Sequence, residues 1–131
     1  MLERDYIMRL IREFMAALQR LLDKKEVEDR REELKKLYDQ YVGPYTLYYN
    51  AGVDEVMLAM GGMVEKERMY KLEILAELYF AEADTVSNPE RDRLLEKAFQ
   101  LFDYLDNNSR VYSMERKKKM QEISNRLNGN K

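Results

Sequence analysis

One tyrosine-rich stretch divides this chain, Tyr38–Gly52, with the sequence YDQYVGPYTLYYNAG. It contains five of the ten tyrosines and one of the two prolines. Within it, Gly43-Pro44 predicts the end of a helix, because glycine suits the residue just past a helix end and proline cannot continue the helix. The break gives three predicted parts: an N-terminal helical pair at 1–42, a crossover with a short helix at 43–62, and a three-helix part at 63–127.

Two amphipathic patterns precede the break. In residues 4–23 and again in 26–42, apolar side chains recur at steps of three and four, which is the spacing of one helix face. The first face consists of Ile7, Leu10, Ile11, Phe14, Leu18, Leu21 and Leu22, and the second of Val27, Leu34, Leu37, Tyr38 and Tyr41. No glycine or proline separates the patterns, so one long helix stays an alternative to the antiparallel hairpin that a turn at 23–26 would give.

Four further helices are predicted after the break. A short helix at 54–60 has two candidate N-caps, Asn50 and Asp54, because short polar side chains accept hydrogen bonds from the first turn. Residues 45–50 fit either a helical turn or an irregular crossover. Three long helices follow at 63–86, 89–105 and 113–127, with a turn at 106–109 and with Asn88 and Ser113 as caps.

The fold class predicted from these patterns is all-α. No run alternates between apolar and polar residues for long enough to be a strand. A chain of 131 residues with 45% hydrophobic and 37% charged side chains, five glycines and two prolines has the composition of one helical domain. We expect a single domain at 1–131, an irregular bundle of about five long helices and one short helix, with no sheet.

Charge is distributed unevenly, although the net charge is only −2. Residues 26–106 carry ten positive and nineteen negative side chains, whereas residues 107–131 carry seven and two. Segments of opposite charge can pack against each other or favour self-association. The charged N-terminus is unlike a signal peptide, and no apolar run is long enough to cross a membrane. We therefore expect a cytoplasmic protein with no membrane partner.

The chain contains neither histidine nor cysteine. It therefore lacks the commonest general base near neutral pH, the commonest metal ligand and the thiol nucleophile. We predict that it is not an enzyme and has no catalytic residue, metal site or cofactor. Glu73, Glu77 and Asp84 leave a carboxylate site open as an alternative, but acids at this spacing on a long helix are most simply solvated. Gly61-Gly62 lacks the other residues of a phosphate-binding loop.

A basic run, Arg116-Lys117-Lys118-Lys119, is the feature that points toward nucleic acid. Glu115 and Glu122 flank it and the chain is acidic overall, so nucleic acid is not favoured as a partner. A solvated helix face is the simplest interpretation. The run could instead contact the acidic middle of the same chain or of a second copy.

Tyrosines and methionines beyond the break supply the candidate interface, whereas Tyr38 and Tyr41 continue a core stripe. Tyrosine buries its ring while its hydroxyl finds a partner, and methionine suits adaptable binding surfaces. A protein or peptide partner, or a second copy in a homodimer, would bind here, and packing of the loop against the core is the alternative. The candidate interface consists of Tyr45, Tyr48, Tyr49, Met57 and Met60.

Two resemblances extend this interpretation. Leu75-Ala76 with Tyr79, followed by Ala98 with Phe102 and Leu105, is similar to the large and small pattern of a tetratricopeptide helix pair. The two alanines are further apart than a standard repeat allows and no second copy follows at a fixed period, so we expect tetratricopeptide-like hairpins rather than an array.

The segments 5–11, 71–78 and 113–117 resemble a family of small, functionally uncharacterised bacterial helical proteins that opens with Asp-Tyr-Ile-Met-Arg. That resemblance implies a helical, tetratricopeptide-like fold and brings no activity or site residues. The function we expect is a non-enzymatic interaction or assembly protein. The alternatives are a small-molecule-binding or carboxylate-dependent enzymatic domain, and a nucleic-acid accessory protein.

Overall fold

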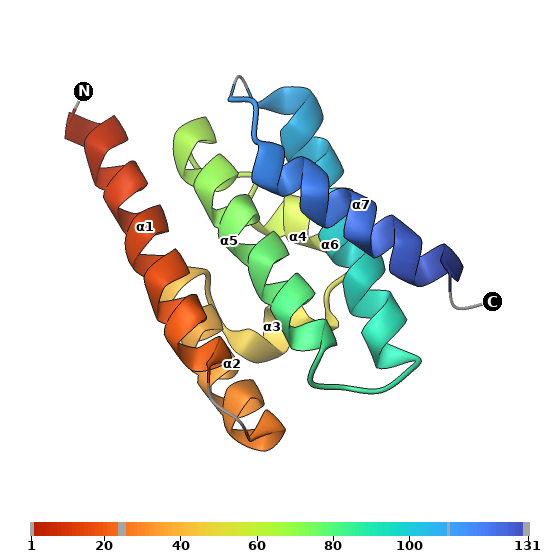
Figure 1. Cartoon of the computed structure of the whole chain (residues 1–131). Helices are drawn as coiled ribbons and strands as arrows, with labels where there is room; N and C mark the ends of the chain where they lie inside the picture. Colours follow the sequence, from red (N-terminus) through yellow and green to blue (C-terminus); the bar gives the residue numbers. More distant parts are fainter. Residues whose placement is uncertain (1, 24–25, 110, 130–131) are drawn as a thin grey trace.

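The computed structural model describes residues 2–23, 26–109 and 111–129, and within them it is all-helical with no strand (Figure 1). The all-α prediction is therefore confirmed. The described part contains one helix more than predicted, because residues 45–50 form a helix of their own. The helices are α1 (Leu2–Leu22), α2 (Val27–Tyr41), α3 (Tyr45–Asn50), α4 (Val53–Ala59), α5 (Glu65–Ala83), α6 (Glu90–Asn108) and α7 (Met114–Gly129).

The first two helices form a hairpin, which decides between the two alternatives for residues 4–42. The connection includes residues 24–25, which lie outside the described residues. Both helices pack against α5, and they also contact each other through an edge-to-face pair between Phe14 and Tyr41, whose ring centroids are 5.4 Å apart. The predicted apolar stripes are buried where they meet these neighbours, at Phe14, Leu18, Leu21, Leu34, Leu37 and Tyr38.

The helix break lies where the sequence predicts it, but glycine acts there for a different reason. No described glycine has a positive φ, so Gly43 does not end α2 through a left-handed conformation. A Cβ atom on Gly43 would lie only 2.7 Å from Cε2 of Tyr48. Glycine is therefore needed because the Tyr48 ring packs directly against the backbone at the end of α2.

The two predicted N-caps of the short helix are wrong. Asn50 ends α3, where its side-chain amide donates to the Thr46 carbonyl, and Asp54 lies in the first turn of α4. The residue at the N-cap is Gly52, whose N–H donates to the Glu55 carboxylate at 2.8 Å. That bond satisfies one of the backbone donors that a helix start leaves free.

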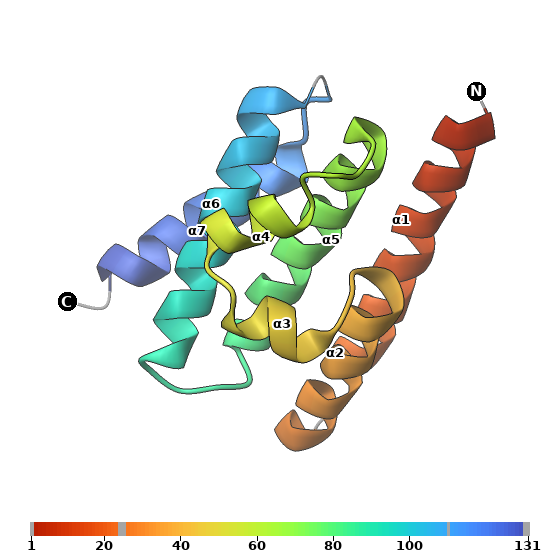
Figure 2. The same ribbon diagram turned by 180° about the vertical axis from the view of Figure 1, so that it is seen from behind.

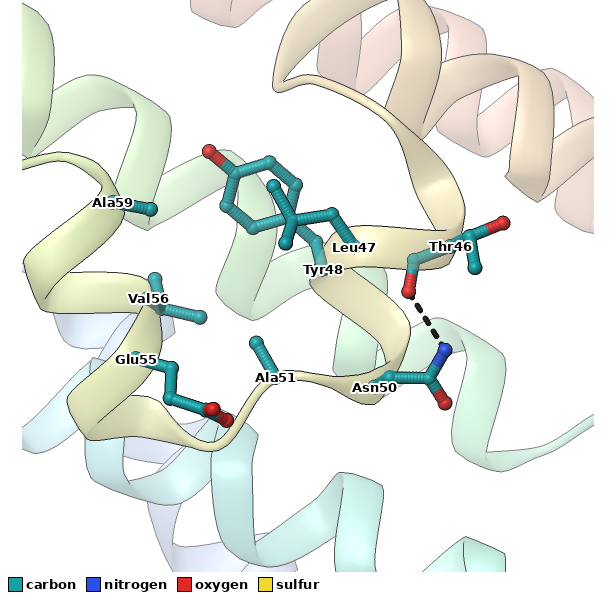
Figure 3. Close-up of a pocket in the computed structure, with 8 residues that line it drawn as sticks. All are labelled: Thr46, Leu47, Tyr48, Asn50, Ala51, Glu55, Val56 and Ala59. Atoms are coloured by element: carbon teal, nitrogen blue, oxygen red, sulfur yellow. Dashed lines mark hydrogen bonds between the residues drawn. The ribbon is translucent and has the colours of Figure 1, made fainter.

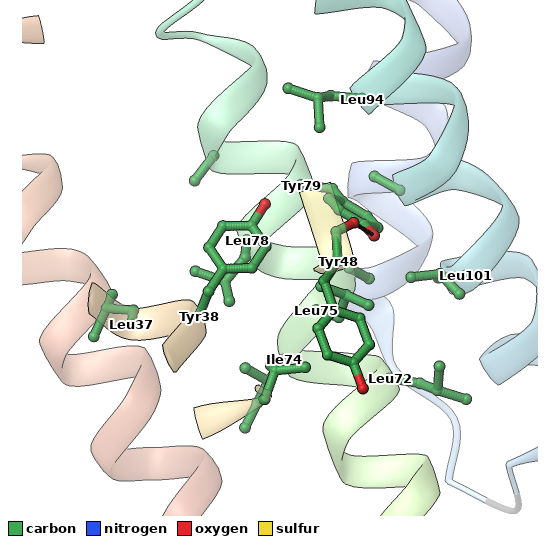
Figure 4. Close-up of a cluster of buried hydrophobic side chains, with 14 of the residues drawn as sticks. Leu37, Tyr38, Tyr48, Leu72, Ile74, Leu75, Leu78, Tyr79, Leu94 and Leu101 are labelled. Carbon is green, nitrogen blue, oxygen red and sulfur yellow. Dashed lines mark hydrogen bonds between the residues drawn. The ribbon is translucent and has the colours of Figure 1, made fainter. Parts of the chain in front are cut away.

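Helix α5 is the centre of the molecule. Its buried side chains face α1 and α2 on one side and α6 on the other, so apolar residues surround it as they do in an internal helix. Figure 4 shows the core that results, with Leu75, Leu78 and Tyr79 between Tyr38 of α2 and Leu101 of α6. The view from behind shows α3 and α4 across one face of α5 and α6, while α1 and α7 flank the opposite face (Figures 1 and 2).

The last two helices confirm one predicted cap and move one predicted end. Ser113 Oγ accepts the Arg116 N–H at 3.1 Å, as expected of an N-cap. Helix α6 continues to Asn108, so the turn predicted at 106–109 is mostly helical. The Asn108 side-chain amide donates to the Tyr104 carbonyl and the Ser109 N–H donates to the Leu105 carbonyl, so these donors satisfy carbonyls of the last turn.

Candidate functional site

The predicted interface residues lie on α3, on α4 and, for Met60, at the C-cap of α4, but they do not form an exposed surface. Tyr48 is 5% exposed and Met60 is 0% exposed, so the prediction that these two side chains contact a partner is wrong. The cause is the packing of α3 onto α5, which turns Tyr48 into the core beside Tyr79. Tyr45, Tyr49 and Met57 are half-buried and pack against the same core.

The tyrosine cluster, which we define as Tyr38, Tyr45, Tyr49 and Tyr79, joins α2, α3 and α5. Tyr45 meets Tyr38 edge-on with centroids 4.8 Å apart and stacks on Tyr49 at 5.4 Å. Tyr38 also packs against Tyr79 at 6.2 Å. Aromatic pairs in these geometries add stabilisation beyond the area that they bury.

Glu82 is the acceptor at the centre of the tyrosine cluster. It is 0% exposed, its Oε1 accepts the Tyr38 hydroxyl at 2.6 Å, and its Oε2 accepts the Tyr45 hydroxyl at 2.5 Å. Arg31 Nε also donates to Oε2, at 3.4 Å. Burial, followed by the nearby Glu82 carboxylate, raises the pKa of Tyr38 well above its usual value, so this hydroxyl keeps its proton.

Lys97 fastens the other end of α3. Its ammonium group donates to the carbonyls of Tyr48, Tyr49 and Ala51 at 3.4, 2.9 and 2.8 Å, and it lies 4.2 Å from the centre of the Tyr79 ring. A cation at the C-terminus of a helix satisfies carbonyls that have no intrahelical donor. Burial, and then the charge of Arg93, lowers the pKa of Lys97 to about 8.

Sequence interpretation missed Glu82 and Lys97, although a signal for both was present. Glu82 is three residues after Tyr79, and Lys97 is three residues after Leu94, so each lies on the apolar stripe of its helix. A charged residue on such a stripe is either buried with partners or breaks the pattern. Both are held by hydrogen bonds to groups far away in the sequence, and both are structural.

The pocket beside α3 and α4 has a volume of about 320 Å³ and offers few unused polar groups (Figure 3). The side chain of Asn50 is held by the Thr46 carbonyl, as the dashed line in the figure shows. Glu55 accepts the Gly52 N–H. The other side chains around the opening are mainly apolar. The pocket therefore has few free polar groups that could recognise a ligand.

A longer depression lies on the opposite face, between α1 and α7. It consists of two adjoining pockets of about 360 and 160 Å³, which share Met15, Glu77 and Lys119. We call it the α1–α7 groove. Its floor is α5 from Glu73 onward together with the C-cap residue Asp84, with Phe102 of α6 beneath the larger pocket. Figure 1 shows α5 between α1 and α7 on this face.

The α1 wall of the groove is apolar. Met15, Leu18 and Leu22 line it, and they continue a stripe at alternating steps of three and four that also includes Met8 and Ile11. Leu18 is buried, whereas Met15 and Leu22 are half-buried and Met8 is exposed. Part of this stripe therefore remains uncovered by the other described residues.

The α7 wall is basic, and its cations are paired. Lys119 donates to both carboxylate oxygens of Glu77 at 2.8 and 2.9 Å, and Arg116 binds Asp106 at 3.1 Å. Arg126 binds Asp84 at 2.9 Å. The interpretation of the basic run as a solvated face is wrong for Arg116, which is buried, and the alternative that the run meets the acidic middle of the same chain is confirmed.

Two carboxylates of the floor are less solvated than the sequence suggested. Glu77 is buried and Glu73 is half-buried, whereas Asp84 is exposed as expected. Burial, followed by the Glu77 charge one turn away, raises the pKa of Glu73. Burial also raises the pKa of Glu77, and the Lys119 ammonium acts against that shift.

No three acidic side chains of the described residues converge as a metal site. None of the helices in the described ranges is long and apolar enough to span a membrane. Comparison of the chain with protein-family models, with curated proteins and with solved structures gives no match. The function is therefore inferred from the geometry of this molecule alone.

Proposed function

We propose that this protein is a non-enzymatic interaction protein and that the α1–α7 groove binds a helical segment of a partner protein. The groove itself carries the proposal, with its apolar wall at heptad spacing on α1 and its charged floor and wall on α5 and α7. Amphipathic helices bind in grooves of this kind by placing apolar anchors at steps of three and four. The charged groups around the anchors fix orientation more than affinity.

The size of the groove limits the partner segment. Its floor, from Glu73 to Asp84, is about 16 Å long, which corresponds to about three turns of a helix. An interface of this length belongs with the small, transient contacts between proteins. We therefore expect dissociation constants in the range of about one micromolar or weaker.

The other functions have less support from the described residues. A small molecule would fit the larger pocket, whose volume of about 360 Å³ is near the lower end for ligand sites. The hypothesis that the chain binds nucleic acid has less support because three of its basic side chains already have carboxylate partners. These are Arg116, Lys117 and Lys119. A cytoplasmic location and the resemblance to a bacterial family stay predictions.

A matched pair of substitutions tests the groove. Gln19 is exposed and lines the smaller pocket, whereas Gln100 is exposed on α6 and lines neither pocket of the groove. Gln19→Trp would fill the groove without altering the core, and Gln100→Trp makes the same chemical change elsewhere. Each variant and the wild type would serve as bait for affinity capture from the cells that express the chain, after circular dichroism has shown equal helix content.

We expect partners that wild type and Gln100→Trp retain and Gln19→Trp loses. Equal retention by all three baits would contradict the proposal. Sedimentation of the purified proteins tests whether the partner is a second copy of the chain. Self-association that only Gln19→Trp abolishes would assign the groove to a homodimer.

A further inference from the structure

Glu73 is the one carboxylate of the groove that is both half-buried and without a direct partner. It lines the larger pocket, and no hydrogen bond or ion pair joins it to any other described residue. Glu77, one turn later on α5, has both of its oxygens bound by Lys119. Glu115 lines the same pocket but is exposed to water.

The cations near Glu73 are already engaged. Arg116 donates from Nε and Nη2 to Asp106 at 3.2 and 3.1 Å and from Nη2 to the Val111 carbonyl at 2.9 Å. Lys119 is held by Glu77. The larger pocket is lined by three carboxylates and two cations, so its lining has one more negative than positive side chain. Arg116 and Lys119 act on the Glu73 charge through space, but both are hydrogen-bonded to other carboxylates.

Two apolar side chains line the pocket beside the same carboxylate. Met15 of α1 and Phe102 of α6 line the larger pocket together with Glu73. A lysine or arginine places its aliphatic stem along apolar surface while its charged end reaches a polar group. A carboxylate beside these two apolar side chains, in a pocket whose cations are bound to other carboxylates, is therefore complementary to one basic side chain, and it disfavours an acidic or a purely apolar one.

We propose that the α1–α7 groove selects a partner helix that carries a lysine or arginine on its apolar face, and that Glu73 binds this cation. The inference rests on the proposed function of the groove. It assigns to Glu73 the ion pair that the folded chain leaves open. Burial raises the pKa of this carboxyl, so the ionised form destabilises the folded chain while no partner is bound.

Three designed peptides of about 14 residues provide the probes, long enough for about three or four helical turns. Each has leucine at heptad positions, and they differ only in one central position of the apolar face, which is lysine, glutamine or glutamate. Binding to wild type, Glu73→Gln and Glu96→Gln would be measured by fluorescence anisotropy. Glu96 is exposed on α6 and lines neither pocket of the groove, so it controls for the loss of one charge.

We expect the lysine peptide to bind wild type and Glu96→Gln about tenfold more tightly than the glutamine peptide, as one charge-assisted hydrogen bond implies. Glu73→Gln should remove that difference. Lysine and glutamine peptides that bind wild type equally, or a preference that survives in Glu73→Gln, would overturn the inference and leave the groove as a binding site. Absence of binding by every peptide would overturn the proposed function.

A second measurement tests the cation site with a small molecule in place of a helical peptide. Amide chemical shifts would be followed during titration with n-hexylammonium and, as the uncharged control, 1-hexanol. Saturable shifts near Glu73 with the ammonium alone, lost in Glu73→Gln, support the assignment, and equal responses to both compounds refute it. Glu73→Gln should at the same time raise the free energy of unfolding of the unbound protein, which a purely structural carboxylate would not do.

Discussion

Substitution of Tyr38 by phenylalanine isolates the buried hydrogen bond at the centre of the tyrosine cluster. The Tyr38 hydroxyl donates to Glu82 at 2.6 Å, and neither side chain has any exposed surface. A hydrogen bond to a charged acceptor contributes about 1.5–3 kcal/mol, and water cannot replace the lost donor at a site without exposure. We therefore expect Tyr38→Phe to lower the free energy of unfolding by about 2–3 kcal/mol.

Urea denaturation followed by circular dichroism measures this loss. In a thermal scan it should appear as a fall in Tm of about 10 °C for a chain of this size. Tyr41→Phe is the matched control, because Tyr41 is half-buried and its hydroxyl has no hydrogen bond to the described residues. A double-mutant cycle with Glu82→Leu should give a coupling of about 1.5–3 kcal/mol. If Tyr38→Phe costs no more than Tyr41→Phe, or if the coupling is near zero, the assignment of Glu82 as the buried acceptor is wrong.

Three further outcomes follow from the same packing. Gly43→Ala should lower the free energy of unfolding by about 1–3 kcal/mol in urea denaturation, because its Cβ would meet the Tyr48 ring at 2.7 Å. Folded Lys97 releases its proton at about pH 8, against an ordinary value of 10.5, so the unfolded chain binds more protons between these pH values. Stability should therefore rise from pH 8 toward pH 10 in wild type and stay flatter in Lys97→Met. Above about pH 10, stability should instead fall as the pH rises. Burial first and the Glu82 charge second raise the pKa of Tyr38 in the folded chain. The unfolded chain therefore loses this proton at a pH at which the folded chain keeps it. The difference in tyrosinate absorbance between wild type and Tyr38→Phe isolates this hydroxyl, because other tyrosines such as Tyr6 and Tyr112 are exposed. A difference at a pH at which both proteins are still folded would contradict the buried state of the Tyr38 hydroxyl.

Much of the fold was predictable because helix periodicity is a local property. Apolar residues at steps of three and four identified α1, α2, α5, α6 and α7 and most of their buried faces. The ends of the helices were less accurate, as the extension of α6 to Asn108 shows. Helix ends depend on which donors lie near the free carbonyls of the last turn and which acceptors lie near the free N–H groups of the first turn. Apolar periodicity does not identify those groups.

The candidate site was harder to predict because burial of an aromatic side chain depends on its neighbours. The sequence placed Tyr45, Tyr48 and Tyr49 beyond the helix break but contained no measure of their exposure. The structure buries Tyr48 and joins Tyr45 to Glu82, a residue 37 positions later in the chain. The groove likewise brings α1 and α7 together over α5, and no local pattern encodes that arrangement.

The sequence by itself determined the helical class, the break at Gly43-Pro44 and the absence of histidine and cysteine chemistry. These properties follow from residue type and from spacing along one helix. Only the tertiary structure decided that the tyrosines after the break are held by Glu82 and Lys97. It also decided that Glu73, in a groove on the opposite face, has no hydrogen bond or ion pair to another described residue. The physical reason is that the partners of Glu82 and Lys97 come from helices far away in the sequence, and the distances between these groups are fixed only when the core packs.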